Sequence, residues 1–275
     1  MKKIYVQTIG KLLTGLSFVF LWAGCTGEKK ADIARENESG VYEIINEISP
    51  DSIEANIRKL VSFHTRHTMS DTISDSVGIG AARRWIHSKF NEYSRRNDNR
   101  LRVSYDRYVE TEHSRISEPT EIVNVVGVLP GTQLESKDRM YVVSGHYDSR
   151  VSDVMNDTSF APGANDDASG TAAVIEMARV MSKYHFDATI IFMAVAGEEQ
   201  GLLGASHYAG HAKERNMNIA AMFTNDIIGS SRAEDGSVRD DVVRVFAEGI
   251  PPNKELSEYH QTLLFTGGEN DTPSR

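Results

Sequence analysis

Between residues 140 and 225, short apolar runs alternate with segments of helical periodicity, and this alternation limits the possible folds more than any other feature. The runs at 140–144, 188–195 and 220–225 have the length and composition of buried strands. A helix over 170–184 separates the first two runs, and a helix that starts near Glu199 separates the last two. Strand–helix–strand order of this kind predicts an α/β fold with helices on both faces of a central sheet.

The flanking segments extend this fold. Ser49-Pro50 is a typical helix start, since serine caps the free amide groups and proline suits the first turn. The same criteria predict helices over 50–61, 82–90 and 255–265, strands over 101–109, 122–129 and 242–246, and a charged loop over 94–100. The whole is expected to be a three-layer α/β domain with a predominantly parallel mixed sheet. Because no element follows residue 265 to close the core, we expect the domain to be incomplete at its C-terminal end.

The first 25 residues have the features of an export signal. Lys2 and Lys3 precede an apolar run of 12 residues, 12–23, which is too short to span a bilayer. The small residues before Cys25 resemble a bacterial lipobox, so we predict a lipoprotein signal peptide over 1–24, a lipid anchor on Cys25, a tether over 25–45 and a catalytic domain over 46–275. The expected location is the cell envelope, periplasmic or on the outer-membrane surface.

Two alternatives to the lipid anchor remain open. Trp22 departs from the leucine usual at its position, which leaves plain secretion possible, and Cys25 could be a buried free thiol. As the only cysteine, Cys25 has no disulfide partner within the chain. The net charge of −9 argues against a nucleic-acid partner, which would require a basic surface.

Four polar clusters follow the predicted strands, at 144–149, 163–170, 196–201 and 225–226. In open α/β sheets, ligands bind at the carboxyl ends of the strands, where all four clusters fall. Taken alone, each cluster has a simpler explanation: exposed polar side chains for His-x-Asp, compensation of a helix dipole for Glu-Glu, and helix capping for Asp-Asp. Their joint occurrence in glycine-framed turns favours one functional site.

The donor types indicate a metal site. One imidazole and several carboxylates suit zinc, and also cobalt or manganese. Enough carboxylates are present to hold two ions, which in such pairs lie about 3.5–4 Å apart. One of the adjacent Glu198 and Glu199 can bind metal while the other takes a proton from water. Asp148, two residues after His146, can hold the second nitrogen of that imidazole.

These motifs, in this order, closely resemble metallopeptidase family 28, whose two-zinc exopeptidases include aminopeptidases, glutamate carboxypeptidases and glutaminyl cyclases. The resemblance covers about 53–275 and implies the zinc exopeptidase fold, which is phosphorylase/hydrolase-like. It implies two Zn²⁺ ions, with Co²⁺ or Mn²⁺ as substitutes. It assigns His146 and Asp226 to the first zinc, Asp166 to both as a bridge, Glu199 to the second zinc, Glu198 to general base catalysis, Asp148 to orienting His146, and a cis peptide to Asp166-Asp167.

The family has a fifth ligand, a histidine far beyond the position of Asp226. His260 is the only histidine after Asp226, and it lies in a predicted helix, so we expect the fifth ligand to be absent from this chain. The stretch 63–68 also resembles a family feature, but its His64 and His67 are expected only to place positive charge at a helix end. A structural or surface role is expected for the other histidines, His87, His113, His185, His207 and His211.

The leading hypothesis is an aminopeptidase acting on peptide N-termini. A carboxypeptidase or dipeptidase would need a cationic clamp for the substrate carboxylate, for which Arg150 and Arg232 are the candidates. A glutaminyl cyclase, which uses one zinc, fits the aspartate pair less well. A non-enzymatic alternative is a surface lipoprotein with an inactive, truncated peptidase fold.

Overall fold

The computed structural model of the chain describes residues 40–233 and 235–241. The predicted strand at 242–246, the predicted helix at 255–265, Cys25 and His260 lie outside them. A compact unit begins at Ile48. Residues 40–46 are helical, although 40–45 were predicted to belong to the tether; Val41, Ile44 and Ile45 follow helical spacing.

The compact unit contains every element that was predicted within its described part. In chain order they are α2 (Pro50–Val61), α3 (Gly78–Arg96), β1 (Arg102–Glu110), β2 (Thr120–Leu129), β3 (Arg139–His146), α4 (Ala168–Met181), β4 (Thr189–Val195), α5 (Leu203–Glu214) and β5 (Asn218–Thr224).

Two predicted boundaries were wrong. α3 continues to Arg96, into the expected loop at 94–100. α5 begins at Leu203 rather than near Glu199, because Gly201 and Leu202 have positive φ angles of 120° and 61° that cannot continue a helix. Glu198 and Glu199 therefore lie in a turn, not in the first turn of a helix.

The sheet has the strand order β1-β2-β4-β3-β5. β2 is antiparallel to both of its neighbours, whereas β3 is parallel to β4 and to β5. Four of the five described strands thus share one direction, which confirms the predominantly parallel mixed sheet. After β4 the chain returns to the other side of β3 to form β5, so β3 lies at the switch point of the topology, where open α/β sheets bind ligands.

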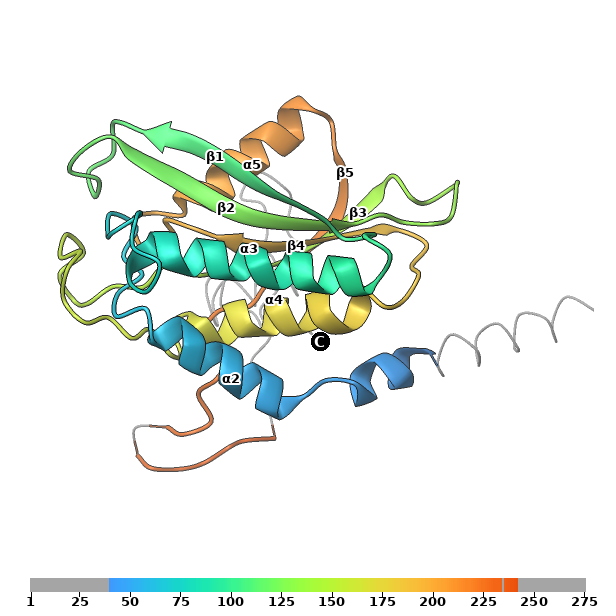
Figure 1. Cartoon of the computed structure of the whole chain (residues 1–275), viewed down its shortest axis with the longest axis horizontal. Coiled ribbons are helices and arrows are strands. Elements are labelled where there is room, and N and C mark those ends of the chain that lie inside the picture. Colours follow the sequence, from blue (N-terminus) through green and yellow to red (C-terminus); the bar gives the residue numbers. More distant parts are fainter. Residues whose placement is uncertain (1–39, 234, 242–275) are drawn as a thin grey trace, which may run out of the picture. The chain divides into compact units, whose positions relative to one another are not determined.

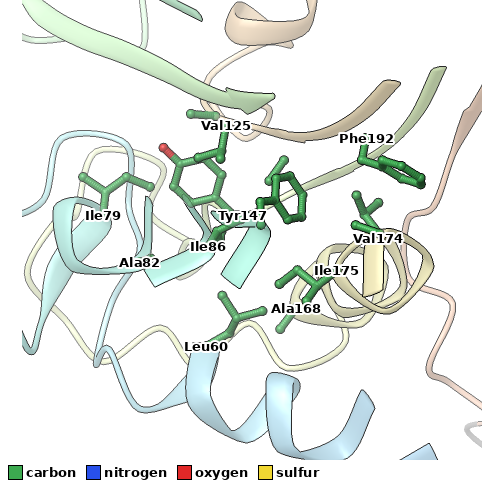
Figure 2. Packing of buried hydrophobic residues seen from close by; sticks show 14 of the residues in the cluster. Leu60, Ile79, Ala82, Ile86, Val125, Tyr147, Ala168, Val174, Ile175 and Phe192 are labelled. Carbon is green, nitrogen blue, oxygen red and sulfur yellow. The ribbon is translucent and has the colours of Figure 1, made fainter. Parts of the chain in front are cut away.

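Helices cover both faces of the sheet, as predicted (Figure 1). α3 and α4 pack on one face, with α2 against α4, and α5 lies over the other face beside β1 and β2. The larger core lies under α3 and α4 and contains Ile86, Ile175 and Phe192, all fully buried (Figure 2). None of the described helices is long and apolar enough to cross a membrane.

The start of α4 lies against the end of β3 because both carry glycine. A Cβ atom on Gly145 would come within 2.6 Å of the Gly170 backbone, and one on Gly170 would come within 2.2 Å of the Asn225 carbonyl oxygen. Only glycine allows such an approach. The packing brings the ends of β3 and β5 and the start of α4 to one place, and this place holds the polar clusters.

Candidate metal centre

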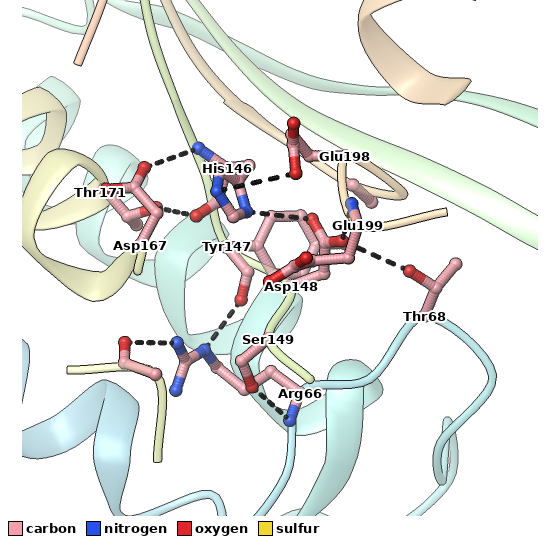
Figure 3. Close-up of polar contacts among 12 residues, drawn as sticks. Arg66, Thr68, His146, Tyr147, Asp148, Ser149, Asp167, Thr171, Glu198 and Glu199 are labelled. Carbon is pink, nitrogen blue, oxygen red and sulfur yellow. Dashed lines mark hydrogen bonds and ion pairs between the residues drawn. The ribbon is translucent and has the colours of Figure 1, made fainter. Parts of the chain in front are cut away.

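His146 is the last residue of β3 and lies at the centre of the cluster (Figure 3). Its side chain is buried, and its backbone is held on both sides: its N–H donates to Asp167 at 3.0 Å, and its carbonyl accepts from the Thr171 hydroxyl at 2.8 Å. The imidazole is therefore presented by rigid backbone at the carboxyl end of a central strand.

Two carboxylates converge on this imidazole. Oδ1 of Asp166 lies 3.1 Å from Nε2 of His146. One ligand atom each from His146, Asp166 and Asp226 lies within 4.8 Å of the other two. Neither ring nitrogen of His146, although buried, has an aligned hydrogen-bond partner. An unpartnered buried imidazole facing two carboxylates fits a zinc ion, which binds nitrogen and carboxylate oxygen.

Asp167 has a structural role that includes the helix capping given above as one explanation of the aspartate pair. It is fully buried and caps α4, accepting from the Gly170 N–H at 2.9 Å while its other oxygen accepts from the His146 N–H. The peptide bond between Asp166 and Asp167 is cis, as the family resemblance implied. Asp167 thus connects the start of α4 to the end of β3 through its two hydrogen bonds, whereas Asp166 faces the cluster.

Asp148 lies behind His146. Its Oδ1 is 3.5 Å from Nδ1 of His146, and its Oδ2 accepts from the Glu199 N–H at 3.1 Å and from the Thr68 hydroxyl at 3.3 Å. The side chain is fully buried. Asp148 thus connects the imidazole to the turn that carries the two glutamates.

The adjacent glutamates point to different places. Oε2 of Glu198 lies 3.9 Å from Nε2 of His146, so this side chain faces the cluster. Glu199 instead pairs with Arg150, whose Nε lies 2.5 Å from its carboxylate. Glu199 is therefore not among the three residues whose ligand atoms converge.

The electrostatics of the cluster favour a bound cation. Burial alone would lower the pKa of His146, but Asp148 and Asp166 outweigh it and raise this pKa to about 12. Burial raises the pKa of Glu198 and that of Asp226, and nearby carboxylates raise both further. A cation at the centre would reduce this repulsion between carboxylates.

Arg66 was not predicted to contribute to this region. α2 ends at Val61, so Arg66 and its flanking histidines lie in the following loop, and their expected role at a helix end was wrong. The Arg66 side chain is fully buried and donates to four carbonyl oxygens, those of Leu60, Tyr147, Pro162 and Gly163. Figure 3 shows the bond to Tyr147. These bonds join α2 to both ends of the connection between β3 and α4, which carries Asp148 and Asp166.

His67 is also buried in this loop, and His64 is exposed. Nε2 of His67 lies 2.9 Å from the Val154 carbonyl oxygen and 3.1 Å from the Gln200 side-chain nitrogen. In the sequence, this buried network is indicated only by Arg66 and His67, a polar pair in the segment that follows the amphipathic helix α2.

Comparison with known proteins identifies the family. The model of Peptidase family M28 matches residues 124–260, which include all six residues predicted for the metal centre. The chain belongs to peptidase family M28. Among its relatives, a protein of Leptosphaeria maculans called "Probable zinc metalloprotease" is 48% identical over 86% of this chain and 54% of its own length. One of the same description from Pyricularia oryzae is 47% identical over 86% of this chain and 47% of its own. This M28 chain therefore spans about half the length of these relatives.

Solved structures agree with the M28 assignment at the level of the fold. An aminopeptidase from Aneurinibacillus sp. strain AM-1 superposes with a TM-score of 0.54 at 16% identity, covering 70% of this chain and 73% of that one. A Bacteroides thetaiotaomicron glutaminyl cyclase gives the same TM-score and identity over 74% of this chain and 66% of that one. These likenesses confirm the predicted zinc exopeptidase-like fold.

Proposed function

We propose that the protein is a zinc-dependent exopeptidase that removes residues from the N-terminus of peptides. The convergence of His146, Asp166 and Asp226 beside the free carboxylate of Glu198 carries this proposal. The zinc metalloprotease relatives support the metal, and the family supports a peptide substrate.

Each residue has a distinct part in the proposed reaction. Bound zinc would polarise the scissile carbonyl and acidify a water molecule. Glu198 would take the proton of that water and pass it to the leaving amine, a task that suits a carboxylate whose pKa is raised by burial. Asp148 would keep the His146 ring in its binding orientation. His146, Asp166 and Asp226 would hold the ion.

A second zinc ion requires a different arrangement of Glu199. Asp166 and Glu199 are the residues that would help to hold a second ion, and Glu199 would have to leave Arg150 to do so. Cobalt or manganese could substitute. When no second ion is bound, Arg150 thus neutralises the charge of the buried Glu199 carboxylate.

The proposal favours an aminopeptidase over a carboxypeptidase because of the charges around the site. A carboxypeptidase needs a cation free to bind the substrate carboxylate. Apart from its pair with Glu199, Arg150 donates through Nη1 to the Val151 and Ser152 carbonyl oxygens, and these two bonds would still hold its guanidinium group if Glu199 moved to a second ion. The negative charge of the cluster suits the positive α-amino group of a peptide N-terminus.

The test is hydrolysis of aminoacyl-p-nitroanilides by the full chain, with and without chelator and added Zn²⁺. We expect chelator-sensitive release that Zn²⁺ restores. Glu198→Gln should lower kcat about 10²–10⁴-fold while zinc binding persists, and Glu118→Gln, at an exposed position, should change nothing. Product formed from N-terminal glutaminyl peptides by ring closure would favour the cyclase instead. Stable zinc binding without hydrolysis of any peptide would favour the inactive alternative.

We further propose that the protein is exported and anchored to a membrane through a lipid on Cys25. The apolar run before a cysteine preceded by small residues supports this proposal. Cys25→Ser should move the protein from the membrane fraction to the soluble fraction after expression in a bacterial host. An unchanged distribution would contradict the anchor.

A further inference from the structure

A second group of metal-binding side chains lies away from the candidate metal centre, between β1 and α5. Asp106 belongs to β1, and His207 and His211 are four residues apart on α5, so both imidazoles project from one side of the helix. One ligand atom from each of the three residues lies within 4.8 Å of the other two. In the described part of the chain, this is the only such group apart from the one at His146.

The distances fit a shared ion better than they fit hydrogen bonds. Nε2 of His207 lies 3.7 Å from Oδ1 of Asp106, and Nδ1 of His211 lies 3.8 Å from the same oxygen. Both separations exceed the roughly 3.2 Å limit of an ordinary N–H···O bond. They approach the ~3.4 Å between ligands of a tetrahedral zinc with bonds of ~2.1 Å.

The surroundings leave the metal-binding atoms available. Nε2 of His207 is buried and has no hydrogen-bond partner, an arrangement that normally costs stability. Oδ2 of Asp106 accepts from Asn124 at 2.9 Å, which fixes the carboxylate and leaves Oδ1 facing the histidines. The His207 ring is further held by stacking on Tyr108, with ring centroids 4.1 Å apart.

We propose that Asp106, His207 and His211 form a second metal site, which binds a divalent transition metal, zinc by preference. Two imidazoles and one carboxylate are a common zinc ligand set, and a water molecule would fill the fourth position. Asn124 extends the site into the fold, because it also donates to the Gly204 carbonyl oxygen and accepts from the Ala196 N–H. A bound ion would thus stabilise the contact of α5 with β1 and β2. The expectation that His207 and His211 are only surface or structural residues would then be wrong.

The experiment counts bound zinc. The full chain is stripped with chelator and titrated with Zn²⁺ by calorimetry, and the bound metal is counted by mass spectrometry. His207→Ala/His211→Ala should bind one equivalent less than the parent. His87→Ala is the matched control, because His87 stacks on Tyr105 of β1 much as His207 stacks on Tyr108. The control should bind as many equivalents as the parent.

Equal stoichiometry in the parent and the folded double variant would overturn the proposal. Circular dichroism checks the fold. Should the double variant not fold, His211→Asn replaces a partly exposed ring with a smaller polar group, and it should weaken one class of zinc sites at least tenfold. Affinities unchanged in His211→Asn would equally overturn the site. The comparison between parent and variants holds whether or not the centre at His146 binds zinc, because the residues of that centre are the same in the parent and in every variant.

Discussion

Replacing Arg66 with methionine is expected to destabilise the protein more than any change of a surface arginine. The guanidinium group is fully buried and donates to the carbonyl oxygens of Tyr147 at 2.7 Å, Pro162 at 2.8 Å, Gly163 at 3.0 Å and Leu60 at 3.1 Å. Methionine reproduces the unbranched stem of arginine but lacks the guanidinium group and has no donor. The substitution therefore removes four hydrogen bonds; the Leu60 and Gly163 carbonyl groups keep backbone donors, Phe63 and Ala168, whereas the Tyr147 and Pro162 carbonyl groups lose the donor that Arg66 supplies.

The size of the effect follows from two opposing terms. Each carbonyl left unsatisfied in the interior costs about 1–3 kcal/mol. The gain is that a costly buried cation disappears; burial lowers the pKa of Arg66 to about 10 despite the attraction of Asp148, Asp167 and Asp166. We expect a net loss of about 3–5 kcal/mol in the free energy of unfolding. For a domain of this size, this loss corresponds to a fall in Tm of roughly 10 °C.

Urea unfolding followed by circular dichroism measures this loss, and Arg84→Met is the matched control. Arg84 also donates to three carbonyl oxygens, those of Thr72, Ile73 and Ser74, but its side chain is 39% exposed, so water can replace it. The control should lose less than about 1 kcal/mol. Equal losses in the two variants would refute the argument that burial makes the Arg66 bonds decisive.

Three further predictions follow from the structure. Asp148→Asn should weaken zinc binding about 10–100-fold in a calorimetric titration and leave the far-ultraviolet spectrum unchanged; unaltered affinity would contradict its orienting role. Gly170→Ala should destabilise the fold in thermal unfolding because its Cβ would meet backbone at 2.2 Å, whereas Gly210→Ala, with open space around it, should not. Burial alone would raise the pKa of Glu176, but hydrogen bonds from Arg179 hold it below its usual value. This contribution exists above the unfolded pKa and disappears as the pH falls through the folded pKa. Glu176→Gln should therefore cost about 1–2 kcal/mol at pH 7 and less at pH 4 in urea unfolding.

The order of helices and strands was predictable because it depends on local patterns. Apolar residues at strand or helix spacing mark the buried side of each element, and Ser49-Pro50 marks the start of α2 through capping. The clusters that follow β3, β4 and β5 were recognisable because parallel strands bring their carboxyl ends to one edge of the sheet. The start of α5 was misjudged because positive φ angles at Gly201 and Leu202 delay it.

The sequence by itself therefore determined the α/β class, and it predicted the position and the donor types of the candidate metal centre. The tertiary structure alone decided the partners of individual side chains: Glu199 with Arg150, Arg66 with three distant carbonyl groups, and Asp106 with two histidines of α5. Periodicity records which side of an element is buried, but it does not record which segment lies opposite. A charged side chain is paired or exposed according to those neighbours, and they are set only when the layers pack.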